Sequence, residues 1–323
     1  LFETLEAALI SAYKRNFNAG ANDVGVYIDK NTGKVKVYSR LRVVEKVGKK
    51  QEEIALEEAK KINLDYEIGD IVEVEVTPRN FGRIAAQTAK QVVIQRIREA
   101  ERELIYEDYI DREHDIITGI IQRFDKKNAI VDLGKTEAIM PSSEQIPGES
   151  FKQGDRVKAF ITEVRKTSKG PQILVSRTHP GFIKRLFELE VPEIYDGTVE
   201  IKSVAREAGS RTKIAVYSAN KDVDPVGACV GPKGSRVQTV SNELKEKIDI
   251  IKWSEDPKEF IANSLSPSKV LSVEIDEEAK MAKVIVPDYQ LSLAIGKEGQ
   301  NARLAAKLTS WKIDIVSDSK LKT

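Results

Sequence analysis

The feature that most constrains this chain is an internal repeat in its C-terminal part. Two Gly-x-x-Gly tetrapeptides, Gly231–Gly234 and Gly296–Gly299, begin 65 residues apart. The tetrapeptide Lys-Ile-Asp-Ile also occurs twice, at residues 247–250 and 312–315, with the same spacing. Two different motifs repeated in one register predict two copies of a single folded module.

Each copy shows the same order of expected elements, which is helix, strand, strand, helix, Gly-x-x-Gly, helix, strand. The order is read from apolar periodicity and from the positions of Gly and Pro. The expected segments of the first copy are 181–189, 198–206, 212–218, 225–230, 235–244 and 248–253. Those of the second copy are 257–264, 270–275, 281–286, 289–295, 300–308 and 312–316. Because only residues 254–256 join the copies, we expect them to pack as one semi-rigid unit.

This element order is that of the type II KH module, in which the Gly-x-x-Gly loop clamps the backbone of about four nucleotides. Glycine lets such a loop approach a phosphate without interference from a Cβ atom. The helix that follows adds free N–H groups and the positive end of its dipole. An isolated tetrapeptide of this kind is more often a helix cap or a turn, so the prediction depends on the repeat and on the flanking helices.

The residues predicted to contact RNA are the loops and the first turn of each following helix. They are Gly231, Pro232, Lys233, Gly234, Ser235 and Arg236 in the first copy and Gly296, Lys297, Glu298, Gly299, Gln300, Asn301 and Arg303 in the second. Bases are expected over an apolar groove, with plain core packing as the alternative role for its candidates Val226, Val230, Leu291 and Ile295. Glu298 puts a negative charge into the second loop, so we expect the first loop to hold phosphate more strongly.

Residues 114–180 change from a helical to a strand-like pattern. Five short apolar runs occur at 116–122, 129–133, 137–140, 156–164 and 173–177, and turn residues separate them. Five short strands in such a short stretch predict a small closed barrel of the OB type.

One face of this barrel is predicted to bind RNA bases. Arg156, Lys158 and Phe160 alternate with apolar residues, so an aromatic ring lies beside two cations, an arrangement that suits base stacking. Arg123 and Phe124 extend this surface. The alternative for Phe160 is that it fills the barrel or a contact between domains.

The first 112 residues contain neither a Gly-x-x-Gly loop nor an OB pattern. Helices are expected at 1–18 and 51–61, and strands at 24–28, 34–38 and 71–76, the first two strands forming a hairpin. Residues 84–111 show long helical periodicity, with an inward-facing stripe of Ile84, Thr88, Val92, Ile97, Ala100, Leu104 and Ile105. A helix of that length, roughly 40 Å at 1.5 Å per residue, is expected to link or support domains.

Composition and motifs exclude several classes of function. The net charge of the 323 residues is +1, so any RNA site must be a local basic patch. One cysteine excludes a disulfide framework, and two histidines leave little material for a metal site or a general base. Residues 227–235 fail the P-loop pattern, because Pro232 and Gly234 occupy the places of its second glycine and its Ser or Thr. We therefore expect no enzyme activity, no catalytic residue, no metal and no cofactor, and no apolar run approaches the roughly 20 residues of a membrane span.

These modules, in this order, resemble the NusA family of bacterial transcription elongation factors over essentially the whole chain. Asn80–Thr88 is similar to the family's entry into the linking helix, and Met140–Glu149 is similar to its barrel signature. Asp224–Gly231 resembles the first KH domain of the family, while Leu291–Gly296 and Gln300–Ala305 resemble the second.

The resemblance implies an α+β multidomain fold and a division of roles. The expected parts are an N-terminal α/β domain with a long helix at 1–112, an S1-type OB β-barrel at 113–180, and type II KH domains at 181–254 and 255–323. The N-terminal domain would dock on RNA polymerase near the RNA exit channel, and the other three would hold single-stranded nascent RNA. The factor would modulate pausing and intrinsic termination, and would support antitermination alongside other Nus factors. A cytoplasmic location and a monomeric state are expected.

Two alternative functions are weighed against this resemblance. Polynucleotide phosphorylases also carry KH and S1-type domains, but they need a large phosphorolytic core, for which the first 112 residues are too few. A general or ribosome-associated single-stranded RNA-binding protein would carry the same modules without contacting polymerase. A pull-down of RNA polymerase would separate this alternative from the first interpretation.

Overall fold

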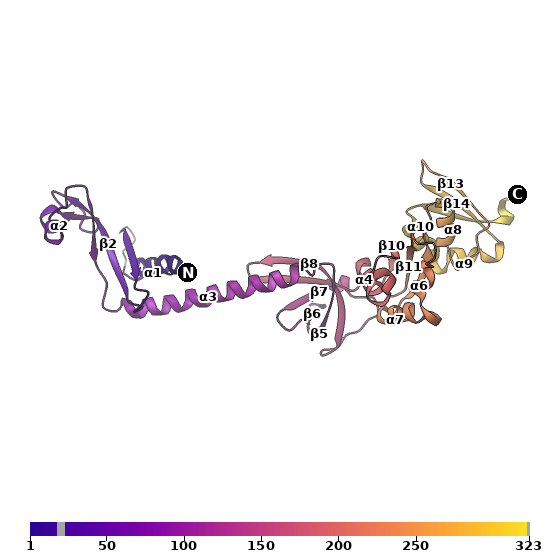
Figure 1. Ribbon diagram of the computed structural model, residues 1–323, viewed down its shortest axis with the longest axis horizontal. Coiled ribbons are helices and arrows are strands. Elements are labelled where there is room, and N and C mark those ends of the chain that lie inside the picture. The colour runs from indigo at the N-terminus through magenta and orange to yellow at the C-terminus, as the bar shows by residue number, and fades with distance from the viewer. Residues whose placement is uncertain (18–22, 322–323) are drawn as a thin grey trace. The chain divides into compact units, whose positions relative to one another are not determined.

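The computed structural model describes residues 1–17 and 23–321, and the chain divides into two compact units, Leu1–Leu104 and Ile105–Thr323 (Figure 1). The described elements form a small α/β domain that leads into a long helix, a closed β-barrel, and two modules that each combine a three-stranded sheet with helices. The predicted α+β multidomain architecture is therefore confirmed.

The first unit is built around its longest strand. Its elements are α1 (Phe2–Asn16), β1 (Val24–Ile28), β2 (Val35–Val44), β3 (Glu53–Ala55), α2 (Leu56–Ile62), β4 (Ile71–Glu75) and most of α3 (Phe81–Ile110). β2 pairs antiparallel with β1 and β4 and parallel with β3. Helix α1 and the start of α3 pack against this sheet through a core that contains Leu9, Tyr13, Val37 and Phe81.

Three expectations for this unit need adjustment. The helix predicted at 51–61 begins only at Leu56, because Ile54 is buried and residues 53–55 pair with β2 instead. The strand predicted at 34–38 continues to Val44. Helix α1 ends at Asn16, and the predicted end of that helix, at residue 18, lies outside the described residues.

The inward-facing stripe predicted for the long helix is wrong in its middle. The core of the first unit buries Phe81 and Ala85 at the start of α3, and the barrel core buries Tyr109 near its end. Between them, Ile97 is 52% exposed and Leu104 is 62% exposed. The spacing of these aliphatic residues identifies the helix, but it does not show that another element covers that face.

The second unit begins with the predicted barrel. Its strands are β5 (Ile116–Asp125), β6 (Asn128–Asp132), β7 (Glu137–Met140), β8 (Arg156–Thr167) and β9 (Gly170–Ser176), closed in the order β5-β6-β7-β9-β8. Gly119 is required where the strands close, because a Cβ atom there would lie 2.4 Å from Val131 Cγ1 and 2.7 Å from the Asp132 carbonyl oxygen. The predicted five-stranded OB barrel is confirmed.

Two modules of the predicted KH order follow the barrel. The first contains α4 (Pro180–Glu190), α5 (Pro192–Tyr195), β10 (Glu200–Glu207), β11 (Arg211–Tyr217), α6 (Pro225–Val230), α7 (Ser235–Leu244) and β12 (Lys247–Lys252). The second contains α8 (Pro257–Ser264), β13 (Ser272–Asp276), β14 (Met281–Val286), α9 (Leu291–Ile295), α10 (Gln300–Thr309) and β15 (Lys312–Ser317). In each sheet the first two strands are antiparallel and the last two are parallel, so the internal repeat predicted from the sequence is a repeat of structure.

The second module packs its helices on the sheet of the first. Phe260 of α8 and Leu304 and Leu308 of α10 share one buried cluster with Ala205 of β10, Ala215 of β11 and Ile251 of β12. Figure 1 shows α10 beside β10 and β11. Apolar burial of this kind joins the two modules more firmly than a three-residue linker alone, as expected for a semi-rigid pair.

Phe160 joins the barrel to the first module, which corrects its predicted role in base stacking. Its side chain is 3% exposed and packs in one cluster with Phe182 and Ile183 of α4. Its ring stacks on His179, with 5.0 Å between ring centroids, and a Cβ atom on Gly181 would lie 2.5 Å from Phe160 Cζ. A ring enclosed on these sides cannot stack on a base, so the contact between domains is its role.

A buried arginine strengthens the same junction. Arg177, at 3% exposure, donates to both carboxylate oxygens of Glu149 at 2.9 and 2.7 Å and to Glu243 Oε1 at 3.0 Å. It also donates to the carbonyl oxygens of Lys158 and Glu243. Removing a charge from water is costly unless its hydrogen bonds are all replaced, and here barrel and KH residues replace them together.

The shared core predicts a large effect on stability for one phenylalanine of the barrel and a small effect for another. Phe160→Ala should lower the free energy of unfolding by about 3–5 kcal/mol, because it leaves a cavity between two domains. Phe124→Ala should change it by less than about 1 kcal/mol, because Phe124 is 45% exposed. Urea titration followed by circular dichroism measures both, and equal effects would contradict the assigned roles.

Candidate nucleic-acid interface

The first Gly-x-x-Gly loop has a backbone that requires glycine at its start. Gly231 has φ 75° and ψ 173°, a conformation essentially restricted to glycine, and a Cβ atom there would lie 2.6 Å from Arg236 Cγ. Lys233 (φ 52°) and Gly234 (φ 78°) continue the turn in left-handed conformations. The amide of Gly234 donates to the carbonyl oxygen of Gly231 at 3.0 Å, which closes the turn.

The second loop repeats this geometry. Gly296 has φ 79° and ψ 171°, Glu298 has φ 53° and Gly299 has φ 74°, and Gly299 N donates to Gly296 O at 3.1 Å. Glu298 therefore occupies the same position and backbone conformation as Lys233 in the first loop. The two loops have one shape and differ in charge.

Both loops present their middle residues and a helix N-terminus to solvent. Pro232, Lys233, Lys297 and Glu298 are all exposed. The N-cap residues of α7 and α10 are Gly234 and Gly299, which have no side chain to accept hydrogen bonds from the first turn. The positive end of a helix dipole attracts anions, so each loop can accept a phosphate.

Two residues predicted to contact RNA form hydrogen bonds that hold the loops in shape. Arg236 and Asn301 lie at equivalent positions of the repeat. Arg236 Nη1 donates to the carbonyl oxygen of Ala228 at 2.7 Å and to Glu193 Oε2 at 2.9 Å. Asn301 is 1% exposed, and its Nδ2 donates to the carbonyl oxygens of Ala294 and Leu265, each at 3.0 Å.

In both copies, therefore, the helix after the loop is tied to the end of the helix before it. For Asn301 the predicted contact with RNA is wrong, because its side chain is buried. For Arg236 the nearby Glu193 carboxylate offsets the charge that the loop was expected to receive.

Two further predicted residues of the second loop face the first KH module. Gln300 Nε2 donates to Glu207 Oε2 at 2.9 Å and to Ser210 Oγ at 2.7 Å. Arg303 Nε donates to Glu207 Oε1 at 2.6 Å, and its side chain is 47% exposed. These contacts lie between domains, and the sequence contains no signal for them because Glu207 is 96 residues from Arg303.

The loops differ in the positive charge that remains for a phosphate. Among the residues that the structure describes, no salt bridge is formed by Lys233 or by Lys297, so both ammonium groups are available. In the first loop Lys233 stands alone. In the second loop Glu298 lies next to Lys297, and Glu207 neutralises Arg303. The geometry therefore supports the predicted ranking, in which the first loop binds phosphate more strongly.

The apolar groove beside the loops is partly as expected. Val226 and Leu291 are half-buried against the cores of their modules, while Ile295 is 37% exposed. Leu293, which is not among the residues predicted for this groove, is 44% exposed on the same short helix. The sequence could have indicated this exposure. Most positions of α9 are apolar, and a short helix can bury only one of its sides, so some of these residues must face solvent.

On the barrel, Phe124 remains the aromatic candidate for base stacking. It lies at the end of β5, next to the turn formed by Lys126 and Lys127, which both have positive φ. Arg123 is held by a bidentate salt bridge to Glu137, at 2.7 and 2.8 Å, with half of its side chain exposed. Lys158 is exposed on β8, where the neighbouring Phe160 is covered. Lys126 and Lys127 follow Phe124 by two and three residues, so the chain places two cations near the exposed aromatic residue.

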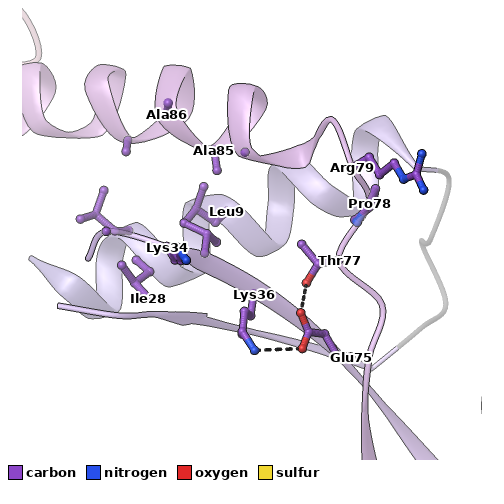
Figure 2. Close-up of a pocket in the computed structure, with 15 residues that line it drawn as sticks. Leu9, Ile28, Lys34, Lys36, Glu75, Thr77, Pro78, Arg79, Ala85 and Ala86 are labelled. Atoms are coloured by element: carbon purple, nitrogen blue, oxygen red, sulfur yellow. Dashed lines mark hydrogen bonds and ion pairs between the residues drawn. The ribbon is translucent and has the colours of Figure 1, made fainter. Parts of the chain in front are cut away.

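A separate cavity of about 690 Å³ lies in the first unit. Figure 2 shows Leu9, Ala85 and Ala86 on its helical walls, from α1 and α3, and Lys36 and Glu75 on the side of the sheet, joined by a salt bridge of 3.0 Å. Small and aliphatic residues make one side apolar, and charged residues border the other. This shape suits the apolar face of a protein segment better than a chain of phosphates.

Within residues 1–17 and 23–321, no three His, Cys, Asp or Glu side chains gather closely enough to hold a metal ion. Burial raises the pKa of the Cys229 thiol to about 12, so at neutral pH this group is protonated and a poor nucleophile. None of the helices described in these ranges is long and apolar enough to span a membrane.

Comparison with known proteins matches most of the chain to four domains, three of which are described as NusA domains. Sequence profiles match the NusA N-terminal domain at residues 1–103, the S1 RNA binding domain at 110–176, the NusA-like first KH domain at 177–253 and the NusA-like second KH domain at 257–323. The transcription termination/antitermination protein NusA of Halalkalibacterium halodurans is 67% identical over 320 residues, which cover 99% of this chain and 84% of that protein.

Other relatives agree. NusA of Bacillus subtilis is 65% identical and NusA of Thermus thermophilus is 47% identical, over 99% and 97% of this chain and 86% and 84% of those proteins. The solution structure of the N-terminal domain of NusA from Bacillus subtilis is 58% identical over 31% of this chain and 81% of that chain, with a TM-score of 0.29.

The charge difference between the loops predicts an unequal effect of two matched substitutions. Lys233→Ala should weaken binding of single-stranded RNA about tenfold, because it removes a charge-assisted contact to phosphate. Lys297→Ala should weaken binding less than about threefold, because Glu298 already offsets that charge. Fluorescence anisotropy with a labelled oligoribonucleotide measures both, and a larger loss for Lys297→Ala would reverse the ranking.

Proposed function

This chain belongs to the NusA family, and on that premise we propose that it binds RNA polymerase and nascent single-stranded RNA and thereby modulates pausing, intrinsic termination and antitermination. It is a transcription termination/antitermination factor with RNA-binding domains, and it acts by binding without a chemical reaction of its own. The observation that carries the RNA part is the pair of loops with equal backbone geometry, each leading into an uncapped helix.

The proposed RNA surface combines the residues that face solvent in the second unit. These are Gly231, Pro232, Lys233, Gly234 and Ser235 in the first loop, Gly296, Lys297, Glu298 and Gly299 in the second, and Arg123, Phe124 and Lys158 on the barrel. The backbone amides and lysines would hold phosphates, while Phe124 and the exposed aliphatic residues would contact bases. Gln300, Asn301, Arg303, Arg236 and Phe160 would support these contacts without touching RNA.

The proposed polymerase contact lies in the first unit. Residues 1–103 match the NusA N-terminal domain, which answers the polynucleotide phosphorylase alternative, because no phosphorolytic core occupies that part of the chain. The cavity beside Ala86 is one surface there that suits a protein segment. If polymerase docks on this unit, the barrel and the KH loops stay free for RNA. The boundary between polymerase binding and RNA binding would then lie near residue 112.

A cytoplasmic location, a monomeric state and cooperation with other Nus factors belong to the same proposal. The net charge of +1 supports localised RNA binding, because a protein with so little excess charge does not coat RNA indiscriminately. A general RNA-binding protein would share the loops but would have no need of a NusA-type N-terminal domain.

Reversing charge in both loops should abolish most RNA binding while preserving the fold. Pro232 and Lys233, and likewise Lys297 and Glu298, would each be changed to Asp, so that carboxylates occupy the exposed middle of both loops. Phosphates would then be repelled, and the log-log salt slope should fall by roughly 0.7 for each phosphate that the loops no longer neutralise. Anisotropy at several salt concentrations tests this, with circular dichroism as the control for folding. A folded variant that binds RNA at wild-type strength would falsify the loop assignment.

A charge in the cavity of the first unit should separate polymerase binding from RNA binding. Ala86→Glu places a carboxylate in the apolar wall and should weaken RNA polymerase binding at least about tenfold, because burying an unpaired charge is costly. Gln87→Glu is the matched control, since Gln87 is exposed on the same helix and does not line the cavity. Neither variant should alter RNA affinity.

Polymerase pull-down and RNA titration on the full chain give both readouts. As a complement, fragment 1–112 should retain polymerase and fragment 113–323 should retain RNA. If fragment 113–323 carried all the polymerase affinity, the proposed roles of the domains would have to be exchanged.

A further inference from the structure

The turn between β10 and β11 lies where three domains meet. On one side, Gly209 packs so closely on the barrel that a Cβ atom there would lie 2.8 Å from the Pro147 carbonyl oxygen. Its amide donates to Glu246 Oε1 at 2.9 Å. Arg206, next to this turn, forms a buried salt bridge with Glu246 at 2.6 Å. The barrel and the first KH module therefore fix this turn in place.

On the other side of the turn, Glu207 at the end of β10 binds residues of the second KH module. Both carboxylate oxygens are used, since Oε1 accepts from Arg303 Nε at 2.6 Å and Oε2 accepts from Arg303 Nη2 at 3.2 Å and Gln300 Nε2 at 2.9 Å. The hydrogen bond with Arg303 holds the pKa of Glu207 below its ordinary value, so this carboxylate is ionised throughout the neutral range.

Arg303 connects Glu207 to the second Gly-x-x-Gly loop. Its remaining terminal nitrogen, Nη1, donates to the carbonyl oxygen of Glu298 at 3.0 Å, in the middle of the loop. The guanidinium thus lies between a loop that is proposed to bind phosphate and a carboxylate from another domain. Because the side chain is 47% exposed, an RNA backbone at the loop would lie close to this guanidinium.

The equivalent place in the first module carries no such charge. Arg303 corresponds in the repeat to Gln238, which hydrogen-bonds Asn242 within its own helix. The first loop therefore depends on Lys233 alone, and the second loop has an arginine that another domain neutralises. Without Glu207, the second loop would have one more positive charge than it has now.

We propose that Glu207 is a charge clamp that restrains RNA binding by the second KH loop. It neutralises Arg303 and holds it, with Gln300, against the first module, so that Arg303 is kept from contacting phosphate. Glu207 acts through Arg303 and is a positioning residue that would itself not touch RNA. This inference rests on the proposed function, since it concerns the strength of RNA binding at the same loops.

The clamp is tested by Glu207→Gln in the full chain, with the first loop disabled by Pro232→Asp and Lys233→Asp. The glutamine side chain keeps the size of the original and removes its charge. Binding of single-stranded RNA should become about fivefold tighter at low salt, and the salt slope should rise by roughly 0.7, the value for one additional phosphate contact. Unchanged or weaker binding would overturn the clamp.

The matched control is Asp276→Asn. Asp276 occupies the position of Glu207 in the second module, at the end of β13, and is exposed. The substitution removes the same unit of charge. Among the described residues, however, Asp276 makes no salt bridge with an arginine. Its RNA affinity should stay within about twofold of the parent chain, because an exposed charge distant from a phosphate is screened by salt. An effect as large as that of Glu207→Gln would show that general charge and not the clamp is responsible, and would overturn the proposal.

Arg303→Gln provides a second, independent test. Because Arg303 is already neutralised, this substitution alone should lower RNA affinity by less than about twofold. In the Arg303→Gln chain, Glu207→Gln should no longer tighten binding, since its target is gone. A large loss from Arg303→Gln alone would show that the arginine contacts RNA in the wild type, and the clamp would be wrong.

RNA binding by the wild-type chain distinguishes a failure of this proposal from a failure of the proposed function. If the wild-type chain binds RNA and depends on the first loop, a missing effect of Glu207→Gln rejects only the clamp. If the wild-type chain does not bind single-stranded RNA, both proposals fail.

Discussion

The arrangement of the second unit depends on one constraint, which is that the sheet of the first KH module must be covered on both faces. Its own helices cover one face, and α8 and α10 of the second module cover the other through Phe260, Leu304 and Leu308. The strands allow this because Ala205 and Ala215 present small apolar side chains to the incoming helices. Since apolar burial is the main favourable term in such a contact, it sets how the two modules lie together and therefore where the second loop can be.

The corresponding sheet face of the second module carries a charged residue where the covered face of the first module is apolar. Strand register places Glu274 opposite Lys283, as Ala205 lies opposite Lys213 in the first module. Exposed and half-buried residues alternate along β13, and Glu274 is one of the exposed residues, whereas Ala205 is 3% exposed. A charged residue at this position keeps the face in water, in the way that a terminal repeat with a polar outer face limits a stack. Glu274 and Ala205 thus differ in the way expected for an uncovered and a covered sheet face.

Much of this architecture is predictable from local pattern, and most of the unpredicted detail concerns partners from distant parts of the chain. The two Gly-x-x-Gly loops, the barrel strands and the long helix follow from motifs and periodicity, which are properties of neighbouring residues. Phe160 was placed on the correct face of its strand, but nothing in the strand shows that α4 covers that face. Asn301 and Arg303 were assigned to RNA because they follow the loop, and their partners, Leu265 and Glu207, are far away in sequence. Short β3 was missed because three residues of strand beside a helix carry almost no periodic signal.

The repeat also separates what must be kept from what is free to change. Gly231 and Gly296 have nearly the same dihedral angles, and Arg236 and Asn301 both tie the loop to the preceding helix, although one is charged and the other is not. The backbone of the loop is therefore maintained by hydrogen bonds to carbonyl oxygens, which different side chains can supply. The charge at the centre of the loop has no such restraint, since Lys233 and Glu298 share one conformation and are both exposed. Two loops of one shape can then differ in their attraction for phosphate. Under the proposed function, the first loop would anchor RNA and the second would add a contact, which the packing between the modules would strengthen.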